Sequence, residues 1–182
     1  MKKVFKCFLS FLLLAGFSNF TQAQTSATET TDAGAVLIVA MTLTETSPLH
    51  FGSNVLTSNA GGTVVLPSNS TTRSYSGGVA TSPATPVATN AAYDVTGTAL
   101  EAYALTLPTS VTVTHTTVSS GVYTMEITDM KARFNGAGVD AVTSTLSSSG
   151  TGSFTLGGKL NVQANQVGGI YAGTFNVSID YN

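Results

Sequence analysis

The sequence predicts an all-β domain that follows a secretory signal peptide. Three observations support this: the chain opens with a basic and then apolar segment, the rest consists of short apolar or alternating runs between turn-forming residues, and the β-branched residues Thr and Val are abundant. Many short strands at regular spacing are typical of a sandwich or a barrel.

The first 23 residues have the order of a signal peptide. Three lysines precede an apolar run over residues 8–17, and Thr21-Gln22-Ala23 then places small residues where signal peptidase requires them. We expect cleavage after Ala23 and an exported protein, in the periplasm, at the cell surface or outside the cell. The apolar run is shorter than the ~20 residues that a membrane span needs, and we expect no integral membrane segment in the mature chain.

Cysteine and charge exclude several classes of function. The only cysteine, Cys7, lies within the predicted signal, so the mature chain can form no disulfide and carries no thiolate ligand or nucleophile. Cleavage also leaves four cationic residues against nine acidic ones, a net charge of about −5. Nucleic-acid binding and basic membrane-surface helices both need clustered Lys and Arg, and we therefore expect neither.

The mature chain divides into a polar N-terminus and one domain. Residues 24–34 have nothing to bury and are expected to be flexible, and residues 35–182 are expected to form a single β-sandwich domain. Glycine pairs at 61–62, 77–78 and 157–158 are interpreted as turns, and residues 129–134 as a helical turn or two. The expected strands are 35–43, 63–66, 91–96, 103–107, 111–118, 122–128, 141–146, 153–156, 159–163 and 170–181.

No set of residues indicates catalysis or metal binding. The two histidines, His50 and His115, are far apart in sequence, whereas a metal site needs three or four suitably spaced ligands. The chain has no Gly-x-Ser-x-Gly elbow and no phosphate-binding glycine loop, and its acidic residues are scattered. We expect no cofactor, no metal and no enzymatic activity.

The last segment carries the clearest amphipathic pattern. Apolar and polar residues alternate strictly up to the C-terminal Asn182, which predicts a half-buried strand. The apolar side consists of Phe175, Val177, Ile179 and Tyr181. This ending resembles the C-terminal strand of chaperone–usher pilus subunits, with Tyr181 as the penultimate aromatic and Gly169 as the glycine fourteenth from the end. An ordinary last strand of a sandwich would show the same alternation.

A wider resemblance covers nearly all of the mature chain. The sequence is similar to the exported bacterial family known as domain of unknown function 4402, and the ending is also similar to that of spore-coat-U-type pilins, whose common cysteines are absent here. The resemblance implies an immunoglobulin-like (pilin-like) β-sandwich and export, but no activity and therefore no site. It rests on Leu49-His50-Phe51-Gly52, Tyr93-Asp94-Val95-Thr96-Gly97, Tyr103-Ala104-Leu105-Thr106-Leu107-Pro108, Gly157-Gly158-Lys159-Leu160 and the Gly173–Tyr181 ending, where Ile179 replaces the usual valine.

The leading hypothesis is a structural or adhesive subunit of the cell surface, of fimbrial type, that assembles by β-strand complementation. Its partners would be other subunits or a periplasmic chaperone. The alternative is a free-standing secreted module that binds a protein or a glycan without polymerising. The absence of tryptophan from the sequence counts against glycan binding.

The candidate donor strand is residues 35–43. Leu37, Val39, Met41 and Leu43 lie on one side of it and could fill the pockets of a neighbouring subunit. The other side is also apolar, with Val36 and Ile38, which favours an ordinary first strand buried in its own domain. The sequence leaves both alternatives open.

Overall fold

The structure is a computed structural model that describes residues 28–53, 55–81 and 85–182. The predicted signal peptide, residues 1–23, lies outside the described residues. Residues 28–41 carry no regular secondary structure, and the folded part of the chain begins after them. None of the described residues belongs to a helix long and apolar enough to cross a membrane.

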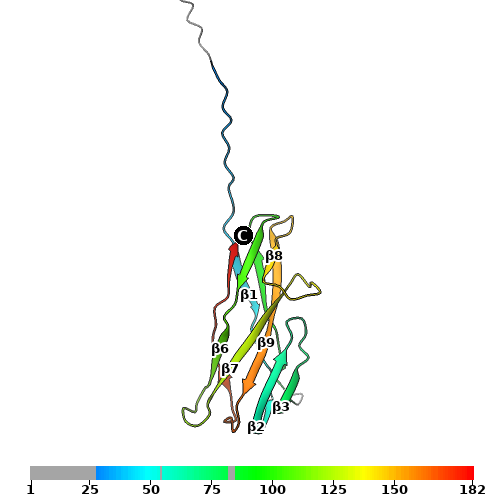
Figure 1. Cartoon of the computed structure of the whole chain (residues 1–182), viewed down its shortest axis with the longest axis vertical. Helices are drawn as coiled ribbons and strands as arrows, with labels where there is room; N and C mark the ends of the chain where they lie inside the picture. Colours follow the sequence, from blue (N-terminus) through cyan, green and yellow to red (C-terminus); the bar gives the residue numbers. More distant parts are fainter. Residues whose placement is uncertain (1–27, 54, 82–84) are drawn as a thin grey trace, which may run out of the picture. The chain divides into compact units, whose positions relative to one another are not determined.

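The domain is an antiparallel β-sandwich, as the sequence predicts (Figure 1). The larger sheet has the order β1-β4-β9-β7-β6-β10, with β2 pairing both β9 and β3, and the smaller sheet has the order β11-β5-β8. The strands are β1 (Thr42–Ser47), β2 (Val55–Leu66), β3 (Ser74–Thr81), β4 (Ala91–Thr96), β5 (Ala102–Thr106), β6 (Ser110–His115), β7 (Thr124–Phe134), β8 (Thr143–Thr145), β9 (Thr151–Val162), β10 (Tyr171–Ala172) and β11 (Ser178–Tyr181).

Strand β9 organises the larger sheet. One of its edges pairs with β7, and the other pairs first with β4 and then with β2. Its apolar side chains Phe154, Leu156 and Leu160 are buried. A long central strand with neighbours on both sides therefore joins all the strands of this sheet into one surface.

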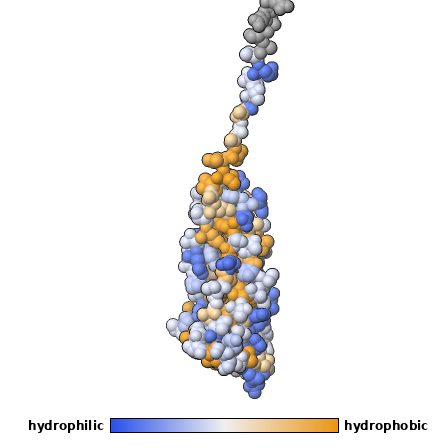
Figure 2. Space-filling view, turned by 90° about the vertical axis from the view of Figure 1, so that its left-hand side faces the viewer, coloured by the Kyte–Doolittle hydropathy of each residue, from blue (hydrophilic) through white to orange (hydrophobic). Residues whose placement is uncertain are grey.

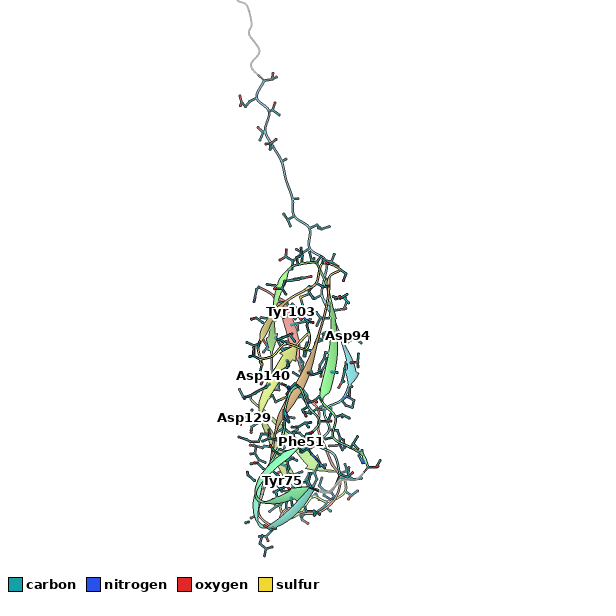
Figure 3. All side chains as sticks on the ribbon, turned by 90° about the vertical axis from the view of Figure 1, so that its right-hand side faces the viewer. Phe51, Tyr75, Asp94, Tyr103, Asp129 and Asp140 are labelled. Atoms are coloured by element: carbon teal, nitrogen blue, oxygen red, sulfur yellow. The ribbon has the colours of Figure 1, made fainter. Side chains whose placement is uncertain are left out.

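The core consists of two apolar clusters, which Figure 3 locates through Tyr103 and Phe51. The Tyr103 cluster joins the two sheets: Tyr103 of β5 meets Phe134 of β7 edge-on at a centroid distance of 5.6 Å. In the same cluster, the rings of Tyr93 and Phe154 stack at 5.0 Å. Aromatic pairs in these arrangements add to the stabilisation that burial alone gives.

The first strand begins later than the sequence predicts. A strand was expected over residues 35–43, but β1 starts at Thr42, which pairs with Thr96 of β4. No strand lies beside residues 35–41 among the described residues, and β-pairing needs a partner backbone. The apolar residues before Thr42 therefore remain outside the sheets.

The glycine pairs also differ from their interpretation as turns, because all three lie inside strands. At Gly157, in the middle of β9, an added Cβ would collide with the Leu66 carbonyl and with the following loop. This glycine is needed because another backbone passes close to it, and the sequence pattern alone does not distinguish that need from a turn.

The predicted helical turn at residues 129–134 is wrong, because β7 continues through it. The register with β9 shifts between Thr128 and Lys131, and Asp129 has a φ of 50°. An extra residue in a strand gives such a β-bulge. The bulge breaks the alternation of side chains, which is why the sequence resembled a helix there.

The last predicted strand, residues 170–181, is two short strands. Strand β10 pairs with β6 of the larger sheet, whereas β11 pairs with β5 of the smaller one. The chain therefore changes sheets between Ala172 and Ser178. At Gly173 an added Cβ would lie 2.6 Å from the Thr112 carbonyl, so the crossing runs tightly against β6.

Candidate assembly site

The C-terminal segment faces the core on one side, as its alternation predicts, yet it is not covered. Phe175, Val177, Ile179 and Tyr181 all pack against the Tyr103 cluster, and the polar residues between them are exposed. Each of the four apolar side chains nevertheless stays partly accessible to solvent. The inward facing of these four side chains agrees with their alternation, but the layer that covers them is incomplete.

The incomplete burial has a topological cause. Strand β11 ends the smaller sheet and pairs only with β5, and β1 ends the larger sheet and pairs only with β4. Within the described part of the chain no strand covers the other edge of either. Unpaired N–H and C=O groups at a sheet edge are a template for a further strand.

These two edges belong to the same side of the sandwich. Side chains from both pack on the Tyr103 cluster, and β1 and β11 lie close together near the C-terminus in Figure 1. Apolar residues form a tract along the face that β11 presents in Figure 2. We call the half-buried apolar side chains of these two edges the seam: Met41, Leu43, Phe175, Val177, Ile179 and Tyr181.

The structure divides the predicted donor residues into two groups. Met41 and Leu43 pack on the core of their own domain and belong to the seam, so they are not free to enter another subunit. Leu37, Ile38 and Val39 are exposed, with 95%, 53% and 63% of their surface accessible. The apolar segment with exposed side chains therefore ends at about Val39, not at Leu43.

Val39 is held at its backbone by the Tyr181 clamp, formed by Val39, Thr98 and Tyr181. The Val39 N–H donates to Thr98 Oγ1 at 2.6 Å. The Tyr181 hydroxyl donates to the Val39 carbonyl at 2.7 Å and accepts from the Thr98 N–H at 2.7 Å. The penultimate residue thus binds the N-terminal segment to the turn after β4.

Gly97 makes room for the Tyr181 clamp. An added Cβ at Gly97 would collide with the Tyr181 hydroxyl and crowd Met41. Gly97 ends a motif that carries the resemblance to the family, but the sequence pattern indicates neither Gly97 nor Thr98 as part of a site. Their role depends on a contact between residues 39, 98 and 181, which no local pattern reveals.

Gly169 lies elsewhere, against His115 rather than at the seam. It has a φ of 150°, and an added Cβ would overlap the His115 imidazole. That ring is buried, and its Nδ1 accepts the N–H groups of Thr117 and Val118 while Nε2 donates to Gly168. The structure therefore gives Gly169 a local packing role.

The second candidate surface is a polar hollow of about 500 Å³ on the larger sheet. Lys131, Arg133 and Lys159 line it, together with Asp129 and Asp140, and Figure 3 labels the two aspartates. Arg133 pairs with Asp140 at 2.9 Å, and Lys159 pairs with Asp129.

The acidic groups of this hollow are held in their charged form. A hydrogen bond from Ser68, with Arg133 nearby, lowers the pKa of Asp140, and Lys159 lowers the pKa of Asp129. Both carboxylates pair with a cationic side chain, which favours their charged form. No group of three or more metal-ligating side chains occurs among the residues described.

The comparisons identify the family. A family model described as "Domain of unknown function (DUF4402)" matches residues 41–181. The chain belongs to the DUF4402 family. The DUF4402 match includes the whole seam and begins just after the exposed residues Leu37–Val39. Searches of curated proteins and of solved structures found no match.

Proposed function

We propose that this DUF4402 protein is an exported structural or adhesive subunit of the cell surface, of fimbrial type, which completes its sandwich with a β-strand from a partner. The observation that carries the proposal is the seam. Two sheet edges on one side of the domain are unpaired within the described residues, and the apolar side chains between them are only half-buried.

An added strand would pair the open sheet edges of the seam and cover its half-buried apolar side chains. Its backbone would pair with the free N–H and C=O groups of β11 or β1, and its alternate side chains would cover Leu43, Val177 and Ile179. Removing these apolar groups from water provides the driving force, at about 25 cal/mol per Å². A domain that worked alone would gain stability by covering the same surface itself.

The partner that fits best is a second copy of the chain. Residues 35–39 are apolar, rich in β-branched residues and exposed, which are the properties of a strand without a sheet. They carry no charge, and neither do the six side chains of the seam. Before assembly a periplasmic chaperone would have the same reason to cover the seam.

The function is tested with a synthetic peptide of residues 33–41 and the purified protein. We expect the peptide to bind and to dissolve assemblies that form on concentration, measured by light scattering after size exclusion. Ile179→Ala should weaken peptide binding by about tenfold, whereas the matched change on the opposite face, Ser178→Ala, should not. A protein that stays monomeric when concentrated and ignores the peptide would show the proposal to be wrong.

Export is a separate part of the proposal and has its own test. N-terminal sequencing of the protein from the producing cell should find a chain that begins near Gln24. An intact Met1 in a membrane fraction would contradict export by a cleaved signal.

The polar hollow favours a second candidate, a free-standing module for an acidic ligand. Three of the four cationic residues among those described line it, in an acidic protein. Lys131→Ala would reduce the binding of an acidic glycan in that case and would leave assembly unchanged. The reverse result, assembly without glycan binding, favours the strand-accepting subunit.

A further inference from the structure

We propose that the Tyr181 clamp keeps the N-terminal strand out of its own seam and so directs it to a second copy of the chain. The inference rests on the proposed function, because it assumes that the seam accepts a strand. It also explains how the partner is selected. The Tyr181 clamp favours strand exchange between two copies over closure within one copy.

The clamp acts at the point where closure would have to begin. To lie along the free edge of its own β1 or β11, the chain must reverse direction between the exposed segment and Thr42, because β1 starts there and β11 ends at the clamp. Val39 lies in this interval, and both its N–H and its carbonyl are already bonded to Thr98 and Tyr181. Refolding these residues into a tight turn breaks hydrogen bonds that the open conformation makes.

The sequence of the interval adds a second obstacle. Residues 36–44 contain no Gly, Pro, Asn or Asp, and Val36, Ile38 and Val39 are β-branched. Tight hairpin turns need positive φ angles at one or both central residues, and β-branched residues adopt these at a high cost. The nearest flexible position, Gly34, precedes the apolar segment, so a turn there would not bring that segment back.

Both obstacles vanish when the acceptor is another molecule. Residues 33–38 lie on the N-terminal side of the clamp and can extend without a turn. Six residues of strand span about 20 Å, whereas the four residues of β11 span about 13 Å, so the segment is long enough for a partner's edge. Each copy would then offer one donor and one seam, a head-to-tail arrangement that propagates.

Disulfide trapping distinguishes the two routes. Leu37 is exposed in the donor and Ser178 is exposed on β11, so cysteines at both positions leave the core untouched. The one natural cysteine, Cys7, is replaced by Ser or removed with the signal. Oxidation should give a ladder of linked copies on a non-reducing gel, whereas closure within a copy gives a compact monomer.

The clamp is then weakened in this background. Tyr181→Phe keeps the ring and loses two hydrogen bonds, and Thr98→Val loses the bond to the Val39 N–H without touching β11. With either change, the ratio of compact monomer to ladder should rise by about tenfold, as expected from one or two hydrogen bonds of ordinary strength. The matched control is Thr96→Val, which removes a hydroxyl contact to Thr42 instead.

The outcomes separate the two proposals. An unchanged ratio in both clamp variants, or a compact monomer as the main product with the clamp intact, would overturn the role of the clamp while the seam still accepts a strand. No disulfide product of either kind, together with no binding of the residue 33–41 peptide, would instead overturn the proposed function.

Discussion

Strands β9 and β11 have the same kind of sequence pattern but very different surroundings. Both alternate apolar and polar residues, yet Phe154 and Leu156 of β9 are 2% and 0% exposed, whereas Ile179 and Tyr181 of β11 are half-buried. Strand β9 has partners on both edges, and β11 pairs on one edge with β5 only. Alternation thus indicates which face of a strand turns toward the core. It does not indicate whether neighbouring strands cover that face completely.

The difference between β9 and β11 explains why the seam could take part in assembly. A strand whose neighbours are present contributes most of its stabilisation within the monomer, because its apolar groups leave water on folding. A strand at an open edge contributes only part of it, and the rest becomes available when something covers the edge. We therefore expect mutations in β9 to affect folding, and mutations in β11 to affect folding less and assembly more.

The largest effect is expected for Phe154→Ala in β9. Its ring packs against both Tyr93 and Phe134, and the cavity left behind should cost about 3–5 kcal/mol of unfolding free energy. Chemical denaturation of the dilute protein measures this loss. A cost below ~1 kcal/mol would mean that β9 is no better packed than the edge strands.

Phe175→Ala should cost less, about 1–2 kcal/mol in the dilute monomer, because its ring is already partly in water. Ser178→Ala, on the exposed face, should stay within ~0.5 kcal/mol. The same denaturation experiment at a concentration where the protein assembles should enlarge the Phe175→Ala effect. Equal effects of Phe175→Ala and Phe154→Ala in the monomer would remove the distinction between β9 and the C-terminal segment that leads into β11.

Tyr103→Phe should be neutral or slightly stabilising, by up to about 1 kcal/mol. The Tyr103 side chain is fully buried, and its hydroxyl finds no partner at hydrogen-bonding geometry within the described residues. Burial raises the pKa of Tyr103, and the nearby Ser144 side chain acts in the opposite direction. Replacing an unsatisfied buried hydroxyl with hydrogen removes a desolvation penalty. A clear loss of stability in a thermal melt would reveal a hydrogen-bond partner of this hydroxyl.

The smallest effect concerns Asp140, which holds Ser68 in the loop that crosses β9 at Gly157. Its folded pKa lies below the unfolded value of about 3.9, so it stabilises the fold above that pH, and this contribution is lost as the pH falls through the folded pKa. Asp140→Asn should flatten the stability profile below about pH 4. A profile identical to that of the unchanged protein would show that the carboxylate contributes nothing.

Local pattern predicted the elements whose side chains alternate without interruption. Strand β4 has the predicted bounds, and β6, which lies in the strand predicted over residues 111–118, alternates buried Val111 and His115 with exposed threonines. Prediction from local pattern was wrong where two backbones that are distant in sequence lie close together. Gly157 resembled a turn because the passing loop 66–68 is invisible in local sequence, and residues 129–134 resembled a helix because a bulge interrupts the alternation.

The candidate site was predictable only where local alternation of side chains determines it. The inward face of Phe175, Val177, Ile179 and Tyr181 follows from their spacing. The division of residues 35–43 into an exposed segment and a part of the seam cannot be predicted from spacing. It depends on where β4 ends and on where β1 begins to pair with it. The Tyr181 clamp was not predictable, since its hydrogen bonds join three distant parts of the chain.

Hydrogen exchange followed by mass spectrometry shows whether β1 and β11 have open edges that accept a further strand. In dilute protein the amides of β1 and β11 that point away from β4 and β5 should exchange quickly, while those of β9 are protected. On concentration, or with the residue 33–41 peptide, protection should rise by at least about tenfold in β1 or β11 and stay unchanged in β9. Equal exchange of β11 under all conditions would show that nothing pairs with this edge and would contradict the account.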